Sequence, residues 1–375
     1  MATPDGQTRD AVAAGAAPVP DVAGDPDARI SFVRMLIRDE ASHTAGMIET
    51  HMSWVYLTDR HAYKLKKPVR YDYLDFSTLE ARRQSCEDEI RLNRRLAPDV
   101  YLAAIPLTVD AEGGLRLNGT GAVVDWLVKM RRLPADQMMD RAITARTLTR
   151  ADVRHVAGFL SHFYLGCAPI ELDPARYREC RARDIGDNLR ELTDPAFALA
   201  ADPIRAVCAA QRAFLEQRAE LFDRRVRAGH IVEGHGDLRP EHICLRPVLA
   251  IIDCLEFSRE LRILDAADEL AYLALECERL GAAWAGDALF VAYTHVTGDA
   301  PDPALVHFHQ SFRACLRAKI ALWHLREARF RSSLKWKQRA LEYLRIAGAH
   351  ASCLAGVAAP TFAASPRSSR RHESA

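Results

Sequence analysis

The spacing of hydrophobic and polar residues changes once along the chain. Between residues 52 and 129, short apolar runs such as 54–57 and 62–66 have the alternation of half-buried strands, and residues 58–61 between them are turn formers. This pattern predicts a strand-rich N-terminal region. Two further strands are expected over residues 100–109 and 122–130.

One helix should interrupt these strands, over residues 77–96. Ser77 with Glu80 three residues later has the spacing of a capping box. From residue 136 onward helical periodicity dominates, except over residues 230–252, where short strands should flank a loop. Pro134 marks the expected junction, because proline disfavours helix in the residue before it. The helices of the second region are expected over residues 148–164, 203–226, 266–280 and 303–347.

The 375 residues therefore divide into an N-terminal lobe, 28–132, and a C-terminal lobe, 133–357. The segments 1–27 and 358–375 are poor in large apolar side chains, so both are expected to be disordered tails. No run approaches the roughly 20 apolar residues that a membrane span needs. The N-terminus lacks the basic and apolar regions of a signal peptide.

Composition narrows the function further. The hydrophobic fraction is 49% and the net charge is +1, so no global field favours nucleic acid or an acidic membrane as a partner. The nine cysteines include no C-x-x-C pair and lie singly in apolar stretches. We therefore expect reduced thiols in a cytoplasmic protein. The oligomeric state is left open.

The residues with the clearest chemistry lie in the sequence His-Gly-Asp-Leu-Arg-Pro-Glu-His, 235–242, which an apolar run and Asp253 follow. Phosphoryl transfer needs a carboxylate to orient the acceptor hydroxyl, a second carboxylate to hold a metal ion, and cations near the phosphates. An aspartate on a loop, a candidate metal ligand five residues later, and a second aspartate after a strand meet that need. The glycine and proline keep the loop out of a helix.

This arrangement resembles the aminoglycoside phosphotransferase-like kinases, relatives of the protein kinases, whose pattern is H-G-D-x-x-x-x-N followed by an apolar strand and I-D. Segments 49–55, 63–68 and 74–80 resemble, in the same order, an uncharacterised bacterial branch of that family. The resemblance implies an α+β, bilobal protein-kinase-like fold. It has an antiparallel-sheet N-lobe with one helix and a mostly helical C-lobe. It also implies ATP-dependent transfer of the γ-phosphate to a hydroxyl of a small molecule.

Residue by residue, the resemblance makes Asp237 the catalytic carboxylate, Asp253 the main Mg²⁺ ligand and His235 a brace for the loop. Arg239 is either a phosphate contact or an ion-pair partner. His242 departs from the pattern, because it stands where asparagine would contribute an oxygen. Magnesium prefers oxygen ligands and imidazole suits softer metals, so His242 is either a structural residue or a ligand that would favour Mn²⁺. Glu256 is a further candidate for the missing oxygen.

The ATP phosphates should meet a lysine of the N-lobe. Lys64 and Lys66 lie on one face of the predicted strand, and Lys64 is the first choice. Helical geometry favours Glu89 as the partner of that lysine. Met130, at the expected interlobe hinge, is a candidate for the adenine pocket. Asp265 should cap the following helix and brace the catalytic loop.

Two other functions remain open from the residues. The segment before the lysine strand lacks a G-x-G-x-x-G loop, which leaves a non-catalytic nucleotide-binding protein as one alternative. A transferase of the adenylyl group is the other. A P-loop kinase is excluded, because G-x-x-x-x-G-K-[ST] is absent. The acceptor cannot be identified from the sequence, and aminoglycosides are not assumed.

Overall fold

The computed structural model describes residues 29–35, 46–71, 74–327, 330–331 and 333–355. The two expected tails lie outside these residues. The chain forms two compact units. Among the described residues, the first consists of 29–35, 46–70, 75–86 and 103–132, and the second of 71, 74, 87–102, 133–327, 330–331 and 333–355. The chain passes from the first unit to the second at residue 132, which is also the predicted boundary between the lobes. Residues 87–102, however, belong to the second unit.

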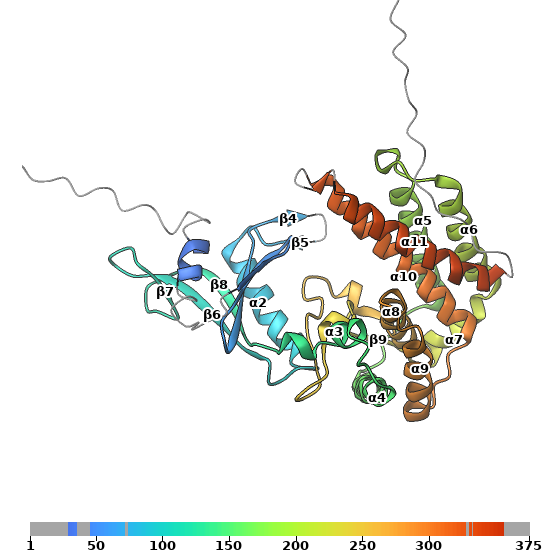
Figure 1. Cartoon of the computed structure of the whole chain (residues 1–375), viewed down its shortest axis with the longest axis horizontal. Coiled ribbons are helices and arrows are strands. Elements are labelled where there is room, and N and C mark those ends of the chain that lie inside the picture. Colours follow the sequence, from blue (N-terminus) through green and yellow to red (C-terminus); the bar gives the residue numbers. More distant parts are fainter. Residues whose placement is uncertain (1–28, 36–45, 72–73, 328–329, 332, 356–375) are drawn as a thin grey trace, which may run out of the picture. The chain divides into compact units, whose positions relative to one another are not determined.

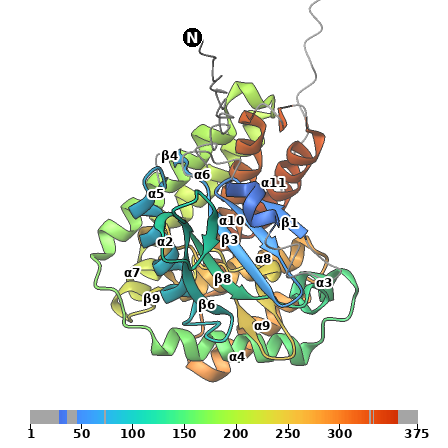
Figure 2. The same cartoon turned by 90° about the vertical axis from the view of Figure 1, so that its left-hand side faces the viewer.

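The first unit is built on a six-stranded sheet in the order β1-β2-β3-β8-β6-β7, and Figure 2 shows β3, β8 and β6 side by side. The pairs β1–β2, β2–β3, β3–β8 and β6–β7 are antiparallel. The predicted antiparallel N-terminal sheet is therefore confirmed. Its strands are β1 (Gly46–Glu49), β2 (Ser53–Leu57), β3 (His61–Lys66), β6 (Tyr101–Val109), β7 (Leu115–Leu117) and β8 (Ala122–Arg131), and a short ribbon pairs β4 (Arg70–Tyr71) with β5 (Leu74–Asp75).

Alternation along β3 separates the two faces of the sheet. Tyr63 and Leu65 are buried in an apolar cluster that includes Val33, from a helix over residues 29–35. Lys64 and Lys66 therefore point to the opposite face. The turn before β3 is closed by the Thr58 N–H, which donates to the His61 carbonyl oxygen at 2.8 Å.

The helix between the strands is α2 (Leu79–Asn93), shorter than predicted at both ends. Its N-cap also differs from the prediction. The hydroxyl of Thr78 accepts the Ala81 N–H at 3.1 Å, while Ser77 donates from its N–H and its hydroxyl to Asp75. The capping box of Ser77 and Glu80 was therefore wrong, because Asp75 engages the serine in a local turn.

The second unit is mostly helical, as predicted, with α10 packed along α11 and α4 along α9 (Figure 1). Two apolar clusters form its core, one around α5, α6, α10 and α11 and the other around α4, α8 and α9. No helix in the described part of the chain combines the length and apolar character needed to cross a membrane. The helices are α3 (Met139–Thr144), α4 (Arg150–Gly166), α5 (Pro174–Leu192), α6 (Ala201–Gln217), α7 (Ala219–Arg227), α8 (Ala266–Arg279), α9 (Trp284–Thr297), α10 (Pro303–Trp323) and α11 (Leu334–Ala355).

Two short antiparallel ribbons interrupt these helices, where the sequence predicted strands. β9 (Ile231–Glu233) pairs with β12 (Ile263–Asp265), and β10 (Ile243–Cys244) pairs with β11 (Ala250–Ile251). The chain between β9 and β10 is the His-Gly-Asp loop, and the turn after β11 carries Asp253. The ribbons thus place the two predicted carboxylates on neighbouring segments.

Candidate active site

The backbone of the His-Gly-Asp loop is held by a buried carboxylate. Glu269, on the first turns of α8, accepts the N–H groups of His235 and Gly236 and the hydroxyl of Tyr164 at 2.5–3.0 Å. Gly236 has a φ of +90°, and a Cβ there would lie 3.0 Å from the Leu255 side chain, so glycine is required for this turn. Burial raises the pKa of Glu269, and the backbone hydrogen bonds oppose that rise.

His235 locks the loop to the strand that leads to Asp253. Its ring is fully buried, with Nε2 2.9 Å from the carbonyl oxygen of Ile252, and Nδ1 accepts the Asp237 N–H at 3.3 Å. These partners require a proton on Nε2 and none on Nδ1. Burial lowers the pKa of His235 to about 4, and the nearby His242 adds to that shift. The neutral ring therefore serves as the expected brace.

Both oxygens of Asp237 accept hydrogen bonds. The hydroxyl of Tyr272 donates to Oδ1 at 2.9 Å, and Arg239 donates to Oδ2 from Nε at 3.0 Å, with Nη2 2.8 Å away. The side chain is 19% exposed. Burial acts to raise the pKa of Asp237, but the charge of Arg239 leads the opposing effects and holds the pKa well below its usual range. Asp237 is therefore ionised at neutral pH.

Arg239 joins three groups of the site. Besides Asp237, it donates from Nη1 to Glu241 Oε1 at 2.5 Å, and its Nη2 lies 2.9 Å from His242 Nε2. The opposite ring nitrogen, Nδ1 of His242, lies 2.9 Å from the backbone oxygen of Asp237. A carbonyl oxygen can only accept, so Nδ1 carries the proton and the Nε2 lone pair faces Arg239.

His242 lies close to both predicted carboxylates. Its Nε2 lies 3.5 Å from Oδ2 of Asp253 and its Nδ1 lies 3.8 Å from Oδ2 of Asp237. The Asp253 side chain is 48% exposed, and its backbone is left-handed with a φ of +64°. This conformation is uncommon among non-glycine residues, although aspartate and asparagine adopt it more readily than most. Asp237, Arg239, His242 and Asp253 thus form one constellation.

Two residues of the second half of α2 and the strand after it fix the Asp253 turn. The N–H of Asp253 donates to the Tyr101 hydroxyl at 3.0 Å, and the N–H of Cys254 donates to Asn93 Oδ1 at 2.9 Å. Arg95 donates to the backbone oxygens of Glu233 and Gly234 at 2.8 Å. Residues 87–102 therefore support the backbone of both the His-Gly-Asp loop and the Asp253 turn.

The remaining predicted residues are placed as follows. Glu89 is fully buried in the second unit, and its pairing with a lysine stays a prediction. Glu256 is half-buried, and its backbone oxygen lies 3.4 Å from Arg262 Nη1. Whether the Glu256 carboxylate reaches a metal stays a prediction. In the first unit, Lys66 is fully buried with Nζ 5.1 Å from the Phe76 ring centroid, whereas Lys64 is partly exposed.

Met130, Lys64 and Lys66 share one face of the sheet. Met130 is directly opposite Ala62, and Lys64 is directly opposite Val128. Cross-strand partners point to the same side, so Met130 projects from the face that carries the two lysines. The choice between Lys64 and Lys66 as the phosphate contact stays open.

Asp265 caps α8 as predicted, because its Oδ1 accepts the Ala267 N–H at 2.8 Å. Its carboxylate also forms a paired hydrogen bond with Arg225 at 2.7–2.8 Å. The carboxylate that holds the backbone of the catalytic loop is Glu269, four residues further on, rather than Asp265. The sequence did not predict the roles of Glu269 and Tyr272. Glu269 lies about one helical turn after the cap at Asp265, and Tyr272 lies about two turns after it.

The donors of this site fit one hard cation better than two. Asp253 offers a half-exposed carboxylate, the kind of oxygen ligand that Mg²⁺ prefers. The lone pair of His242 Nε2 faces Arg239 and would be free for a metal only after that guanidinium moves away. The residues therefore fit a magnesium ion on Asp253, whereas the geometry of His242 favours the structural role.

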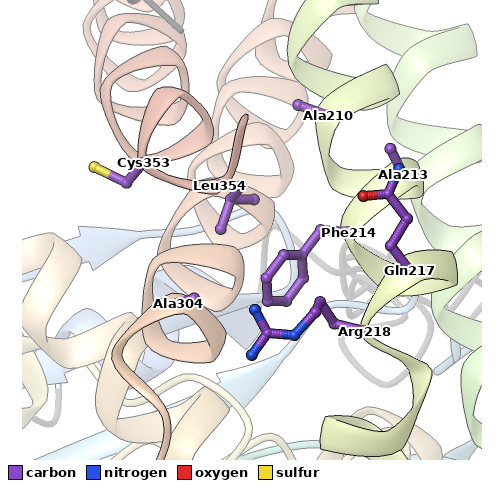
Figure 3. A pocket seen from close by; sticks show the side chains of 8 residues that line it. All are labelled: Ala210, Ala213, Phe214, Gln217, Arg218, Ala304, Cys353 and Leu354. Carbon is purple, nitrogen blue, oxygen red and sulfur yellow. The ribbon is translucent and has the colours of Figure 1, made fainter. Parts of the chain in front are cut away.

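A pocket of about 390 Å³ lies elsewhere in the helical unit (Figure 3). It is lined by α6, the start of α10 and the end of α11, with Phe214, Leu354 and Arg218 around it. Arg218 also pairs with Asp302 at 3.2 Å. None of the residues of the catalytic loop lines this pocket, so it does not bear on the chemistry above.

Comparison with solved structures defines the class of fold. A choline/ethanolamine kinase family protein from Mesorhizobium loti aligns over 88% of this chain and 94% of its own, with a TM-score of 0.50 and 15% sequence identity. The fold is therefore kinase-like, and the resemblance seen in the sequence is confirmed at the level of the fold. No family model matches the chain.

Among curated proteins, the uncharacterized proteins Rv2004c of Mycobacterium tuberculosis and Mb2027c of Mycobacterium bovis are each 35% identical over 277 residues. The match covers 72% of this chain and 53% of either relative. The chain thus spans about half the length of the curated relatives it matches.

Proposed function

We propose that this chain is an ATP-dependent phosphotransferase that transfers the γ-phosphate to a hydroxyl group of a small molecule. The observation that carries the proposal is the pair of carboxylates that lie on either side of His242. Asp237 is ionised and held at both oxygens, and Asp253 lies 3.5 Å from the same histidine with a half-exposed carboxylate. The kinase-like fold supports this assignment as an analogy.

The low pKa of Asp237 determines how it would act. A carboxylate that is a weak base cannot remove a proton from an alcohol early in the reaction. It can accept a hydrogen bond from the acceptor hydroxyl and orient it, taking the proton only when the bond to phosphorus makes that oxygen acidic. A loose transition state for phosphoryl transfer is compatible with such late proton transfer.

The other residues have separable roles in this proposal. Asp253 would hold Mg²⁺, which supplies positive charge to the phosphate oxygens. Arg239 is within reach of Asp237 and presents a permanent cation, so it is our candidate for a contact to the transferred phosphate. Lys64 or Lys66, Glu89 and Met130 are proposed to bind the nucleotide. All nine cysteines are free thiols, which supports a cytoplasmic location.

Isosteric substitutions test the two carboxylates separately. Asp237→Asn should lower magnesium-dependent ATP hydrolysis roughly 10²- to 10⁴-fold and leave ATP affinity intact, because it removes the positioned carboxylate alone. Asp253→Asn should weaken ATP binding in the presence of Mg²⁺ as well. Asparagine tolerates the left-handed backbone, so strain does not confuse the result. Calorimetric titration with ATP, with and without Mg²⁺, and steady-state hydrolysis are the measurements.

The control is Asp202→Asn, at the start of α6, where the side chain is 92% exposed. It should change neither binding nor hydrolysis. Lys64→Ala and Lys66→Ala, compared in the same assays, identify the phosphate contact. A wild-type protein that binds no nucleotide would falsify the proposal. Binding without any effect of Asp237→Asn on turnover would favour the nucleotide-binding alternative, and the mass of a transfer product distinguishes phosphoryl from adenylyl transfer.

A further inference from the structure

Tyr272, in the middle of α8, reaches the proposed catalytic carboxylate from inside the protein. Its hydroxyl donates to Asp237 Oδ1 at 2.9 Å, and the residue is 2% exposed. Burial raises the pKa of Tyr272 well above its usual value, and the charge of Asp237 acts in the same direction. The phenol therefore stays protonated and remains a donor over the whole neutral range.

The ring of Tyr272 is fixed by a buried ion pair. The guanidinium of Arg313 lies 5.2 Å from the ring centroid, within cation–π range. Arg313 in turn donates from Nε and Nη2 to the two oxygens of Asp268 at 2.7 and 2.9 Å. Asp268 is fully buried, and Arg181 Nη1 lies 3.6 Å from it. This pair leaves the tyrosine little freedom to move away from Asp237.

The two donors to Asp237 differ in their surroundings. Arg239 is shared with Glu241 and His242, and its side chain is 17% exposed. Tyr272 lies on the enclosed side of the carboxylate, on the helix whose Glu269 holds the loop backbone. Arg239 can exchange these partners for a phosphate group. The buried hydroxyl of Tyr272 should instead keep its hydrogen bond to Asp237 throughout the reaction.

We propose that Tyr272 is a positioning residue for phosphoryl transfer, which fixes the orientation of the Asp237 carboxylate and is itself held by the Arg313–Asp268 pair. The inference rests on the proposed function, since it assumes that Asp237 orients the acceptor or the attacking water. It adds a residue that the sequence motif does not contain. Tyr272 acts through Asp237 and needs no contact with substrate.

Removing the hydroxyl has two opposed effects. A carboxylate that loses a donor becomes more basic, which would accelerate proton transfer by a few-fold at most. A carboxylate that can rotate spends less time in the reactive orientation, and small misplacements can cost up to about 10²-fold. Orientation should dominate, so we expect Tyr272→Phe to lower kcat roughly 10-fold. The KM for ATP should stay within about two-fold, because the nucleotide contacts are unchanged.

Tyr293→Phe is a matched control. Tyr293, on α9, is also 2% exposed and donates to an aspartate, Asp299 Oδ2, at 2.7 Å. Both substitutions therefore remove one hydroxyl from a buried tyrosine–aspartate pair of the same unit. Magnesium-dependent ATP hydrolysis is measured for the three proteins between pH 6 and pH 8. The loss in Tyr272→Phe should be the same across this range, because Asp237 remains ionised, and Tyr293→Phe should match the wild type.

Proton NMR gives a readout that does not depend on turnover. A slowly exchanging hydroxyl proton of Tyr272 should appear downfield in the wild type, disappear in Tyr272→Phe, shift or disappear in Asp237→Asn, and persist in Tyr293→Phe. Absence of such a resonance, or equal kcat values for the two tyrosine variants of an active enzyme, overturns the inference and leaves the proposed function standing. A wild type without nucleotide binding overturns both.

Discussion

The loop that carries Asp237 and the turn that carries Asp253 are enclosed to different degrees. The first is tied to α8 through Glu269 and Tyr272, and the Asp237 side chain is 19% exposed. The second is fixed through its backbone, while the Asp253 side chain is 48% exposed. In the proposed function, Asp237 orients a hydroxyl and benefits from rigid support. Asp253 is proposed to bind an ion and benefits from access. Substitutions around the first should therefore affect folding, and substitutions at the second should affect binding.

The largest effect on stability should come from Glu269→Gln. The amide keeps one acceptor but presents an NH₂ group to the N–H donors of His235 and Gly236. Hydrogen bonds to a charged acceptor contribute about 1.5–3 kcal/mol each, so we expect the free energy of unfolding to fall by roughly 3–5 kcal/mol. Urea denaturation measures the change.

The control is Glu220→Gln, whose side chain is 67% exposed and pairs with Arg227, and it should change stability by less than about 0.5 kcal/mol. Equal losses in the two variants would contradict the role of Glu269.

A second test uses the pH dependence of His235. Its pKa falls from 6.5 in the unfolded chain to about 4 in the folded protein, so protons bind preferentially to the unfolded chain between these values. The stability from the neutral ring is complete above pH 6.5 and is lost as the pH falls toward 4. His235→Gln should therefore destabilise the protein by about 2–3 kcal/mol more at pH 7 than at pH 4.5. The exposed His155→Gln should show no such difference. A penalty for His235→Gln that is independent of pH would mean that the fold does not lower the pKa of His235.

The smallest effect is expected at His242, where the two regions meet. If His242 is structural, His242→Asn should leave the ratio of magnesium- to manganese-supported hydrolysis unchanged, although the rate falls a few-fold through the lost contact with Arg239. If His242 binds metal, the wild type should prefer Mn²⁺, and the substitution should shift that preference toward Mg²⁺. Metal titrations of both proteins separate the outcomes. The geometry favours an unchanged ratio.

Local patterns in the sequence were sufficient to predict the N-terminal sheet and the His-Gly-Asp loop. Strands β2 and β3 follow from alternation around a polar turn. Residues 237, 239 and 242 lie in one loop, and the antiparallel β10–β11 ribbon brings residue 253 back beside that loop. The N-cap of α2 was misplaced by one residue, since Asp75 competes for Ser77 through a local turn that the capping pattern ignores.

The support from α8 could not be predicted in the same way. This helix is buried around most of its surface, including Asp268, Glu269 and Glu276, so hydrophobic periodicity does not show which face meets the loop. Tertiary packing alone decides that Glu269 faces the backbone of the loop while Asp268 faces Arg313. Helix α5 was also missed, although Asp173 as N-cap and Pro174 at the first position are a local signal for its start.

The division of α2 between the two units has a consequence for recombination between relatives. Asn93, Arg95 and Tyr101 hold the backbone of the His-Gly-Asp loop and the Asp253 turn, although they precede most of the second unit in the sequence. A chimera joined at residue 132 would combine these three side chains from one parent with the loop they support from another. Crossovers at residues 86 and 102 would instead keep the native partners in the same inherited block. The residues that must be inherited together to keep the proposed site intact are therefore discontinuous in the sequence. Their first part, residues 87–102, lies within the range predicted as the N-terminal lobe.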